Sequence, residues 1–358
     1  MKYYMPTRVF SEKNCIANHS AELAALGSHA LIITGKSSSK LTGSLDDIIS
    51  ALKKHSVEYT VFDKTEENPS VETVMAARDA GLECNADFVI GIGGGSPLDA
   101  AKAAALMIRN SNRSWEFLYE SSPAAALPLA AVPTTCGTGS EVTGVAVLTR
   151  HDMKTKVSAK HKVFPDIALI DGKYLLKAPK RIIVNTSIDA LAHLIESAIN
   201  TSADTYSDMS VFSGLSLWKK CRPYIDGSEE LNEEAAQLLM DTAALAGISI
   251  AQTGTTIPHS LSYMLTYHAG IPHGAAVGAF QSKYLKYADP DRKAAVLGAA
   301  GFRDTDELGG YISSLAPVRA DRSLLESSAE SVLHNKAKLG LCPYIITENI
   351  MSDIIDIL

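Results

Sequence analysis

The sequence contains no cluster of lysine and arginine residues and no long uninterrupted apolar segment. A face that binds nucleic acid or an anionic membrane needs clustered basic side chains, whereas this chain of 358 residues has a net charge of -7. No window approaches the roughly 18 apolar residues of a membrane-spanning helix. We therefore expect a small-molecule partner, no nucleic acid and no membrane.

Cysteine is scarce as well, with five widely separated residues and no C-x-x-C pair. This argues against a disulfide framework and against a thiolate zinc site. The N-terminal segment runs into the polar residues 11–14 (SEKN), unlike the apolar core of a signal peptide. Together these features predict a reducing compartment and a cytoplasmic protein.

Apolar segments of strand length alternate with helical patterns in the first half of the chain. This alternation predicts βαβ units and a parallel sheet that is covered on both faces. After about Pro179 the strand patterns almost vanish and long helical patterns follow, so a 358-residue chain divides naturally into an α/β domain (1–178) and an all-helical domain (179–358). The expected strands include 29–34, 57–62, 87–92 and 127–132, and the expected helices include 45–54, 97–109, 235–252 and 277–287.

A glycine-rich loop follows the expected strand 87–92. Three consecutive glycines lead into a helix for which Ser96 is the expected N-cap, with Pro97 at the first helical position and Asp99 in the first turn. Free amides and the helix dipole at such a helix start favour a phosphate. The match to G-x-G-x-x-G is imperfect because Ser96 takes the third glycine position, so a simple tight turn is the alternative.

A second loop, 134–141, is rich in hydroxyl residues and also follows an expected strand. By itself it is typical of a wide turn. Paired with the glycine loop, it predicts the second wall of a nucleotide cleft at the carboxyl ends of parallel strands.

Asp189 and His193 are four residues apart, so on a helix they project from one face, as two ligands of a single ion must. His259, His268 and His273 lie in a polar interruption of helical sequence and are further candidates. Any one histidine is more often a packed or surface residue than a ligand. One carboxylate with several imidazoles, however, suits Fe(II) or Zn(II) better than Ca(II) or Mg(II).

These motifs together resemble the iron-containing (group III) alcohol dehydrogenase family, in order and over nearly the whole chain. The matching segments are GIGGGSPLDAAK, PTTCGTGSEVT and the D-x-x-x-H pair. A further match is His259 followed fourteen positions later by His273, which lies in the segment IPHG. The resemblance implies a Rossmann-like dinucleotide-binding domain and an all-helical metal-binding and substrate domain, which together enclose a cleft. Dehydroquinate synthase shares this architecture. The metal ligands that it implies are Asp189, His193, His259 and His273. The cofactor residues that it implies are Asn68, Gly94, Gly95, Ser96, Asp99, Thr134, Thr135, Thr138 and Lys156.

Two positions depart from the family pattern. Many members carry a histidine one turn after the third ligand, where this chain has Tyr263. Either Tyr263 relays protons or contacts substrate, or His268 has that task, or Tyr263 only packs. NAD-preferring members often place an aspartate after the early strand, where this chain has Gly35, followed by Ser37 and other donors up to Lys40. We therefore assign Gly35 and Ser37 to the cofactor site and favour NADP over NAD, although Gly35 also suits a plain turn.

The expected activity is that of a metal-dependent alcohol dehydrogenase or aldehyde reductase, which transfers a hydride between NAD(P)H and a small primary alcohol or aldehyde. Fe(II) is the expected ion, with Zn(II) as the alternative, and we expect a homodimer. A glycerol dehydrogenase, a glycerol-phosphate dehydrogenase or a dehydroquinate synthase-like enzyme is the alternative within this fold. A nucleotide- or metal-binding module without turnover is the alternative of another class.

Overall fold

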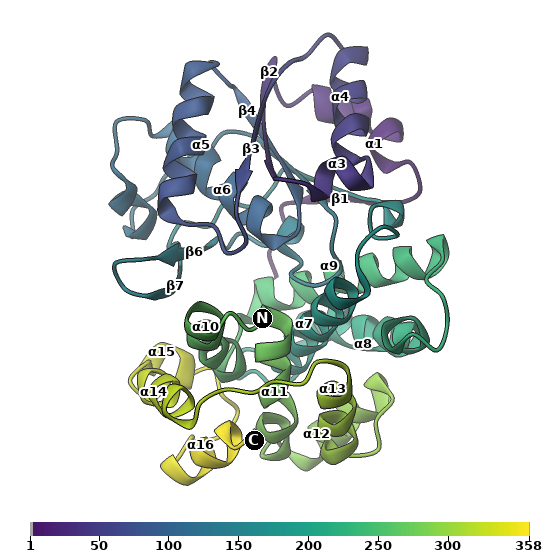
Figure 1. The fold of residues 1–358 in the computed structure, drawn as a ribbon, viewed down its shortest axis with the longest axis vertical. Helices are drawn as coiled ribbons and strands as arrows, with labels where there is room; N and C mark the ends of the chain where they lie inside the picture. Colours follow the sequence, from purple (N-terminus) through teal and green to yellow (C-terminus); the bar gives the residue numbers. More distant parts are fainter. Residues whose placement is uncertain (1–2, 358) are drawn as a thin grey trace. The chain divides into compact units, whose positions relative to one another are not determined.

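A computed structural model describes residues 3–357, which form two compact units (Figure 1). The first, here called the α/β unit, contains residues 5–178 and 232–244. The second, the helical unit, contains residues 3–4, 179–231 and 245–357.

Six parallel strands form the sheet of the α/β unit, in the order β1-β8-β5-β4-β2-β3. Neighbouring residues of β2 alternate between its faces: Ala30 and Ile32 join one apolar core, and Leu31 and Ile33 join the other. Helices α5 and α6 cover one face, and α1 and α4 lie on the other (Figure 1). This arrangement confirms the predicted parallel sheet. The strands are β1 (Arg8–Ser11), β2 (His29–Gly35), β3 (Glu58–Thr65), β4 (Phe88–Gly93), β5 (Leu129–Pro133) and β8 (Ile167–Ile170), with a separate antiparallel pair β6 (Val147–Arg150) and β7 (Thr155–Ser158).

The helices of this unit connect the strands in the order that the sequence pattern predicts. They are α1 (Cys15–Asn18), α2 (Ser20–Ala24), α3 (Ser38–Thr42), α4 (Ser44–Lys54), α5 (Val71–Glu83) and α6 (Gly95–Arg109), with short 3-10 turns η1 (Trp115–Tyr119), η2 (Ser140–Val142) and η3 (Gly172–Tyr174).

The strand order places a topological switch point between β2 and β4, because the chain proceeds outward from β2 to β3 and then returns past β2 to β4. In open α/β sheets, ligands bind outside the carboxyl ends of the strands at such a point. Gly35 is the last residue of β2, and Gly94 directly follows β4. The fold therefore brings two of the predicted cofactor segments together at the carboxyl ends of β2 and β4.

The helical unit is organised around α7, of which residues 187–198 are all buried. A helix that is buried on every side is normally apolar all round, yet α7 carries Asp189, His193 and Glu196 within this stretch. Helices α8 and α11 pack against α7, and α10 packs against α11. The helices are α7 (Lys180–Ala198), α8 (Thr205–Asp226), α9 (Glu233–Thr253), α10 (Ile257–Ala269), α11 (His273–Lys286), α12 (Pro290–Ala300), α13 (Thr305–Leu315), α14 (Arg322–Leu333), α15 (Lys336–Leu339) and α16 (Glu348–Ile355). Of α9, only residues 245–253 belong to this unit, since residues 233–244 belong to the α/β unit.

Among the described residues, none of these helices combines the length and the apolarity needed to span a bilayer.

Candidate metal centre and nucleotide loops

Three helices of the helical unit deliver the four predicted metal ligands. Asp189 and His193 lie one turn apart on α7, His259 lies in the first turn of α10, and His273 begins α11. The Nε2 atoms of His193, His259 and His273 lie 3.9, 3.5 and 3.7 Å from the same Asp189 Oδ1. Ligand atoms at about 2.0–2.2 Å from an ion in tetrahedral array are roughly 3.3–3.6 Å apart, so these four groups have the spacing to hold one ion.

Two polar atoms at this centre are buried and accept or donate no hydrogen bond among residues 3–357. They are Asp189 Oδ1 and His259 Nε2. Buried polar atoms nearly always have a partner, and an orphaned one costs free energy. A divalent cation between them would satisfy both, and the oxygen and nitrogen donors suit Fe(II) or Zn(II). The residues present thus fit the implied metal.

Electrostatics at the centre favour a cation. Burial opposes ionisation of Asp189, but the imidazoles of His193 and His273 outweigh that effect and hold the pKa of this carboxyl well below its usual range. Burial also disfavours the charged form of His259, yet the carboxylates of Glu196 and Asp189 together raise its pKa to about 9. Below that pH a metal ion competes with a proton for His259, so metal binding releases a proton.

Close approach of α11 to α7 depends on Gly274, which directly follows His273. A Cβ atom built at Gly274 would lie 1.8 Å from the backbone oxygen of Asn185 on α7. Only glycine permits this separation, and the separation brings His273 to Asp189. The Ser262 hydroxyl lies 3.2 Å from His273 Nδ1, which leaves Nε2 for the metal.

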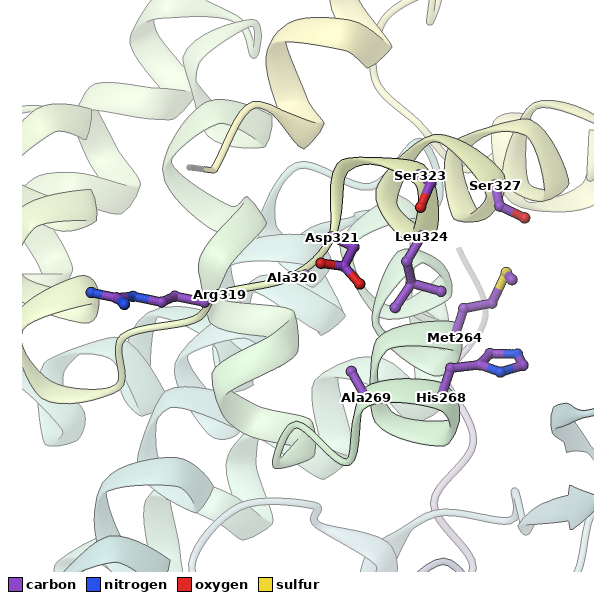
Figure 2. Close-up of a pocket in the computed structure, with 9 residues that line it drawn as sticks. All are labelled: Met264, His268, Ala269, Arg319, Ala320, Asp321, Ser323, Leu324 and Ser327. Atoms are coloured by element: carbon purple, nitrogen blue, oxygen red, sulfur yellow. The ribbon is translucent and has the colours of Figure 1, made fainter.

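Of the two candidates for proton relay, Tyr263 lies beside the centre. It follows His259 by one helical turn, and its ring centroid is 6.2 Å from that of His273, with the rings inclined by 27°. His268 is exposed and lies nine residues, or about two and a half helical turns, after His259, so its side chain projects from the opposite face of α10. Figure 2 shows His268 and Met264 projecting together from α10 into a pocket that α14 and the segment before it also line. The geometry favours Tyr263 over His268.

In the α/β unit the glycine loop and the threonine loop lie side by side, because β4 and β5 are neighbours. A Cβ atom at Gly94 would meet Thr135 at 3.2 Å, and one at Gly95 would meet Thr138 at 2.7 Å. The Thr134 hydroxyl is buried and has no hydrogen-bond partner among the described residues. Because Gly94 and Gly95 have no side chains, the threonine loop lies close to the start of α6 and the backbone amides there stay uncovered, which suits a diphosphate.

Ser96 is not the N-cap that the sequence predicts. Helix α6 starts at Gly95, its N-cap is Gly94, and no side chain caps it. Ser96 instead lies inside the first turn, where its hydroxyl accepts a hydrogen bond of 3.0 Å from the backbone N–H of Asn68. The capping prediction was wrong by two residues, because the chain turns at Gly93, which has φ 147, and the helix begins directly after Gly94.

Asn68 connects several of the predicted cofactor residues. It has a left-handed backbone with φ 56, and the Thr149 hydroxyl donates to its carbonyl oxygen at 2.7 Å. The Lys156 ammonium donates to its side-chain oxygen at 3.3 Å, and Lys156 is itself buried. Asn68, Ser96 and Lys156 therefore lie together beside the glycine loop.

The segment after β2 offers fewer donors than its sequence suggests. Ser37 is exposed, but Ser39 is buried, and Lys40 is paired with Asp63 at 2.7 Å. Gly35 ends β2, and a Cβ atom there would meet nothing closer than the Thr65 oxygen at 3.5 Å. A side chain at position 35 would therefore fit, and the glycine of this chain leaves that space unfilled.

Buried charged residues near these sites that the sequence did not single out include Lys102 and Glu196. Lys102 donates to the hydroxyls of Ser140 at 2.6 Å and Thr143 at 3.1 Å, and Ser140 donates to Asp99 at 2.5 Å, so Asp99 and Lys102 fasten the threonine loop to α6. The Asp99-x-x-Lys102 spacing was the available signal. Glu196 lies three residues after His193, and its signal was a second carboxylate about one turn after that histidine in a largely apolar helix segment.

Comparison with known proteins gives one consistent result. Residues 6–172 match the model of the family described as "Iron-containing alcohol dehydrogenase", and residues 183–302 match the C-terminal model of the same family. The solved structure of an iron-containing alcohol dehydrogenase from Thermotoga maritima is 34% identical, with a TM-score of 0.91 over 99% of this chain and 98% of that one.

Curated relatives extend the comparison to proteins with named activities. A long-chain primary alcohol dehydrogenase of Thermoanaerobacter ethanolicus is 32% identical over 262 residues, a match that spans 72% of this chain and 65% of the relative. An NADPH-dependent butanol dehydrogenase of Clostridium saccharobutylicum is 27% identical over 80% of this chain and 74% of the relative.

Proposed function

Because this chain belongs to the iron-containing alcohol dehydrogenase family, we propose that it interconverts a small primary alcohol and its aldehyde by hydride transfer with NAD(P)H. The family confirms the expected class, a metal-dependent oxidoreductase acting on alcohols with Fe and NAD(P), and does not favour the glycerol, dehydroquinate or non-catalytic alternatives. The observation that carries the proposal is the convergence of three imidazole nitrogens within 3.9 Å of one buried carboxylate oxygen.

The proposed ligands are Asp189, His193, His259 and His273. An ion held there would supply Lewis-acid activation of the substrate oxygen, while the nicotinamide carries the hydride. Tyr263, one turn from His259 and beside His273, is the residue we place next to the reacting groups, where its hydroxyl would contact substrate or move a proton. His268, exposed on α10, is the less favoured candidate.

For the cofactor, we propose that the diphosphate lies against Gly94, Gly95 and Ser96, at the switch point of the sheet. Asp99 shapes this loop through Ser140, and Thr134, Thr135 and Thr138 form the neighbouring wall. Asn68 and Lys156 complete the polar surroundings.

We favour NADP over NAD because position 35 has no carboxylate to repel a 2′-phosphate, and exposed Ser37 lies close by in sequence. Pairing of Lys40 with Asp63 weakens the part of this argument that relied on Lys40. The NADPH-dependent name of the Clostridium relative agrees with the preference.

Metal analysis of protein purified without air, followed by NADH and NADPH oxidation with short aldehydes, tests the proposal. We expect roughly one equivalent of metal per chain, as one shared ligand set implies, and activity that a chelator removes and Fe(II) or Zn(II) restores. Metal-loaded protein that oxidises neither nicotinamide across a broad aldehyde panel would overturn it, and His268→Ala serves as a control variant that keeps the metal.

We also propose a homodimer. Tyr3, Tyr4, Tyr206 and Met209 expose apolar surface in the helical unit, between 47% and 67% of each residue. Light scattering that gives the mass of a single chain at micromolar concentration would contradict this proposal.

A further inference from the structure

Glu196 lies behind the metal centre, and none of its surface is exposed. Its Oε1 atom lies 2.5 Å from His259 Nδ1 and accepts from Gln281 Nε2 at 2.8 Å. Its Oε2 atom accepts from the Thr256 amide at 2.6 Å and the Thr256 hydroxyl at 2.7 Å. Both carboxylate oxygens are therefore fully engaged, which offsets the cost of burying this charge.

The bond to His259 determines which ring nitrogen faces the metal centre. An ionised carboxylate can only accept, so His259 Nδ1 carries the proton. Nε2 then faces Asp189 Oδ1, 3.5 Å away, and is the nitrogen left for a metal ion. In metal sites a carboxylate on the far nitrogen of a histidine fixes its tautomer and ring orientation and raises its basicity.

Glu196 also connects the three helices that carry the ligands. It belongs to α7 with Asp189 and His193, Thr256 is the N-cap residue of α10, and Gln281 belongs to α11. One carboxylate thus bonds to the start of the helix that presents His259 and to the helix that presents His273.

We propose that Glu196 is the positioning residue of the metal centre: it orients His259 through Nδ1 and thereby sets the affinity for the ion. This inference rests on the proposed function, because it assigns a role toward the metal that the ligand set would hold. Glu196 itself touches neither ion nor substrate in this scheme.

The test is the variant Glu196→Gln, which keeps the size of the side chain but supplies one acceptor where four donors converge. Affinity for Zn(II), measured by competition with a chromophoric chelator, is expected to fall roughly 10–100-fold. The visible spectrum of the Co(II)-substituted variant should also change, because the His259 ring is no longer held. Thr256→Val is the matched control, since it removes one hydroxyl donor to Glu196 but keeps the His259 bond.

Thermal unfolding of the metal-free proteins separates positioning from mere support of the fold. We expect Thr256→Val to keep the wild-type Zn(II) affinity and Co(II) spectrum even where both variants unfold at lower temperature. Equal losses of affinity in the two variants, or wild-type affinity and spectrum in Glu196→Gln, would overturn the role of Glu196. If Glu196→Gln does not fold, Glu196→Asp, which keeps the charge but withdraws it by one methylene, is judged by the same two measurements. Failure of the proposed function is distinct, because wild-type protein would then bind no metal or oxidise no NAD(P)H.

Discussion

Gly274→Ala is the substitution that best tests whether helix packing builds the metal centre. The added methyl group would lie 1.8 Å from the Asn185 backbone oxygen, whereas an ordinary contact begins at 3.4 Å. Helix α11 must therefore move away from α7 by about 1.6 Å, and the neighbouring His273 moves with it. Metal-ligand distances tolerate only about 0.2 Å, so His273 is lost as a ligand.

The energetic consequence is partly compensated. Overpacking costs roughly 1–3 kcal/mol, and replacing a helical glycine with alanine returns roughly 0.5–1 kcal/mol. The net loss in the free energy of unfolding is then about 0–2.5 kcal/mol, which leaves most domains folded. Metal affinity should fall by more than the roughly 10–100-fold that the loss of an outer partner causes.

The assay combines Zn(II) affinity, denaturant unfolding of metal-free protein and aldehyde reduction. Gly298→Ala on α12 is the matched control, because a Cβ atom there meets nothing within 4 Å. The control should keep metal and activity and gain roughly 0.5–1 kcal/mol in stability. Wild-type metal affinity in Gly274→Ala would refute the reasoning, since it would mean that the close approach of α11 to α7 does not position His273.

Three further predictions concern the cofactor, the α/β core and proton transfer. Gly35→Asp should lower the preference for NADPH over NADH more than tenfold, because a like-charge contact with a 2′-phosphate costs several kcal/mol; an unchanged ratio of kcat/KM would contradict an NADP site there. Burial raises the pKa of Glu141 to about 7 from 4.5, so its contribution to stability is fully present below pH 4.5 and is lost as the pH rises to about 7. Glu141→Gln should therefore flatten the pH dependence of the unfolding free energy by roughly 3 kcal/mol between pH 4 and 8, and parallel wild-type and variant curves would contradict this. Tyr263→Phe should lower kcat roughly 100-fold and alter its pH profile if the hydroxyl moves a proton, whereas His268→Ala should leave both near wild type; the reverse pattern would assign the task to His268.

Local pattern was sufficient for much of the fold. Strand and helix are distinguished by the spacing of apolar residues, so the alternation before Pro179 and the helices after it were readable, and the parallel sheet followed. The glycine loop was recognisable because helix-start chemistry is local, but the position of its cap was not. Gly93 at φ 147 starts α6 earlier, and Ser96 bonds instead to Asn68, which lies 28 residues away in sequence.

The metal centre divides in the same way. Asp189 and His193 share a face because four residues make about one helical turn, so that half of the centre was determined by the sequence alone. Whether His259 and His273 reach the same carboxylate depends on how α10 and α11 pack on α7, through contacts such as Gly274 against Asn185 that have no local pattern. The family resemblance predicted His259 and His273 as ligands, but only the tertiary structure gives their distances from Asp189.

What only the tertiary structure decided is which groups support the predicted ones. Glu196, Lys102 and the Lys40 pair with Asp63 are set by long-range hydrogen bonds. A buried charge is tolerated only where several partners from different elements converge on it, and that convergence is a property of packing rather than of any segment. The sequence by itself determined the two classes of unit, the phosphate-type loop and the first two ligands, because each depends on neighbours within one turn or one strand.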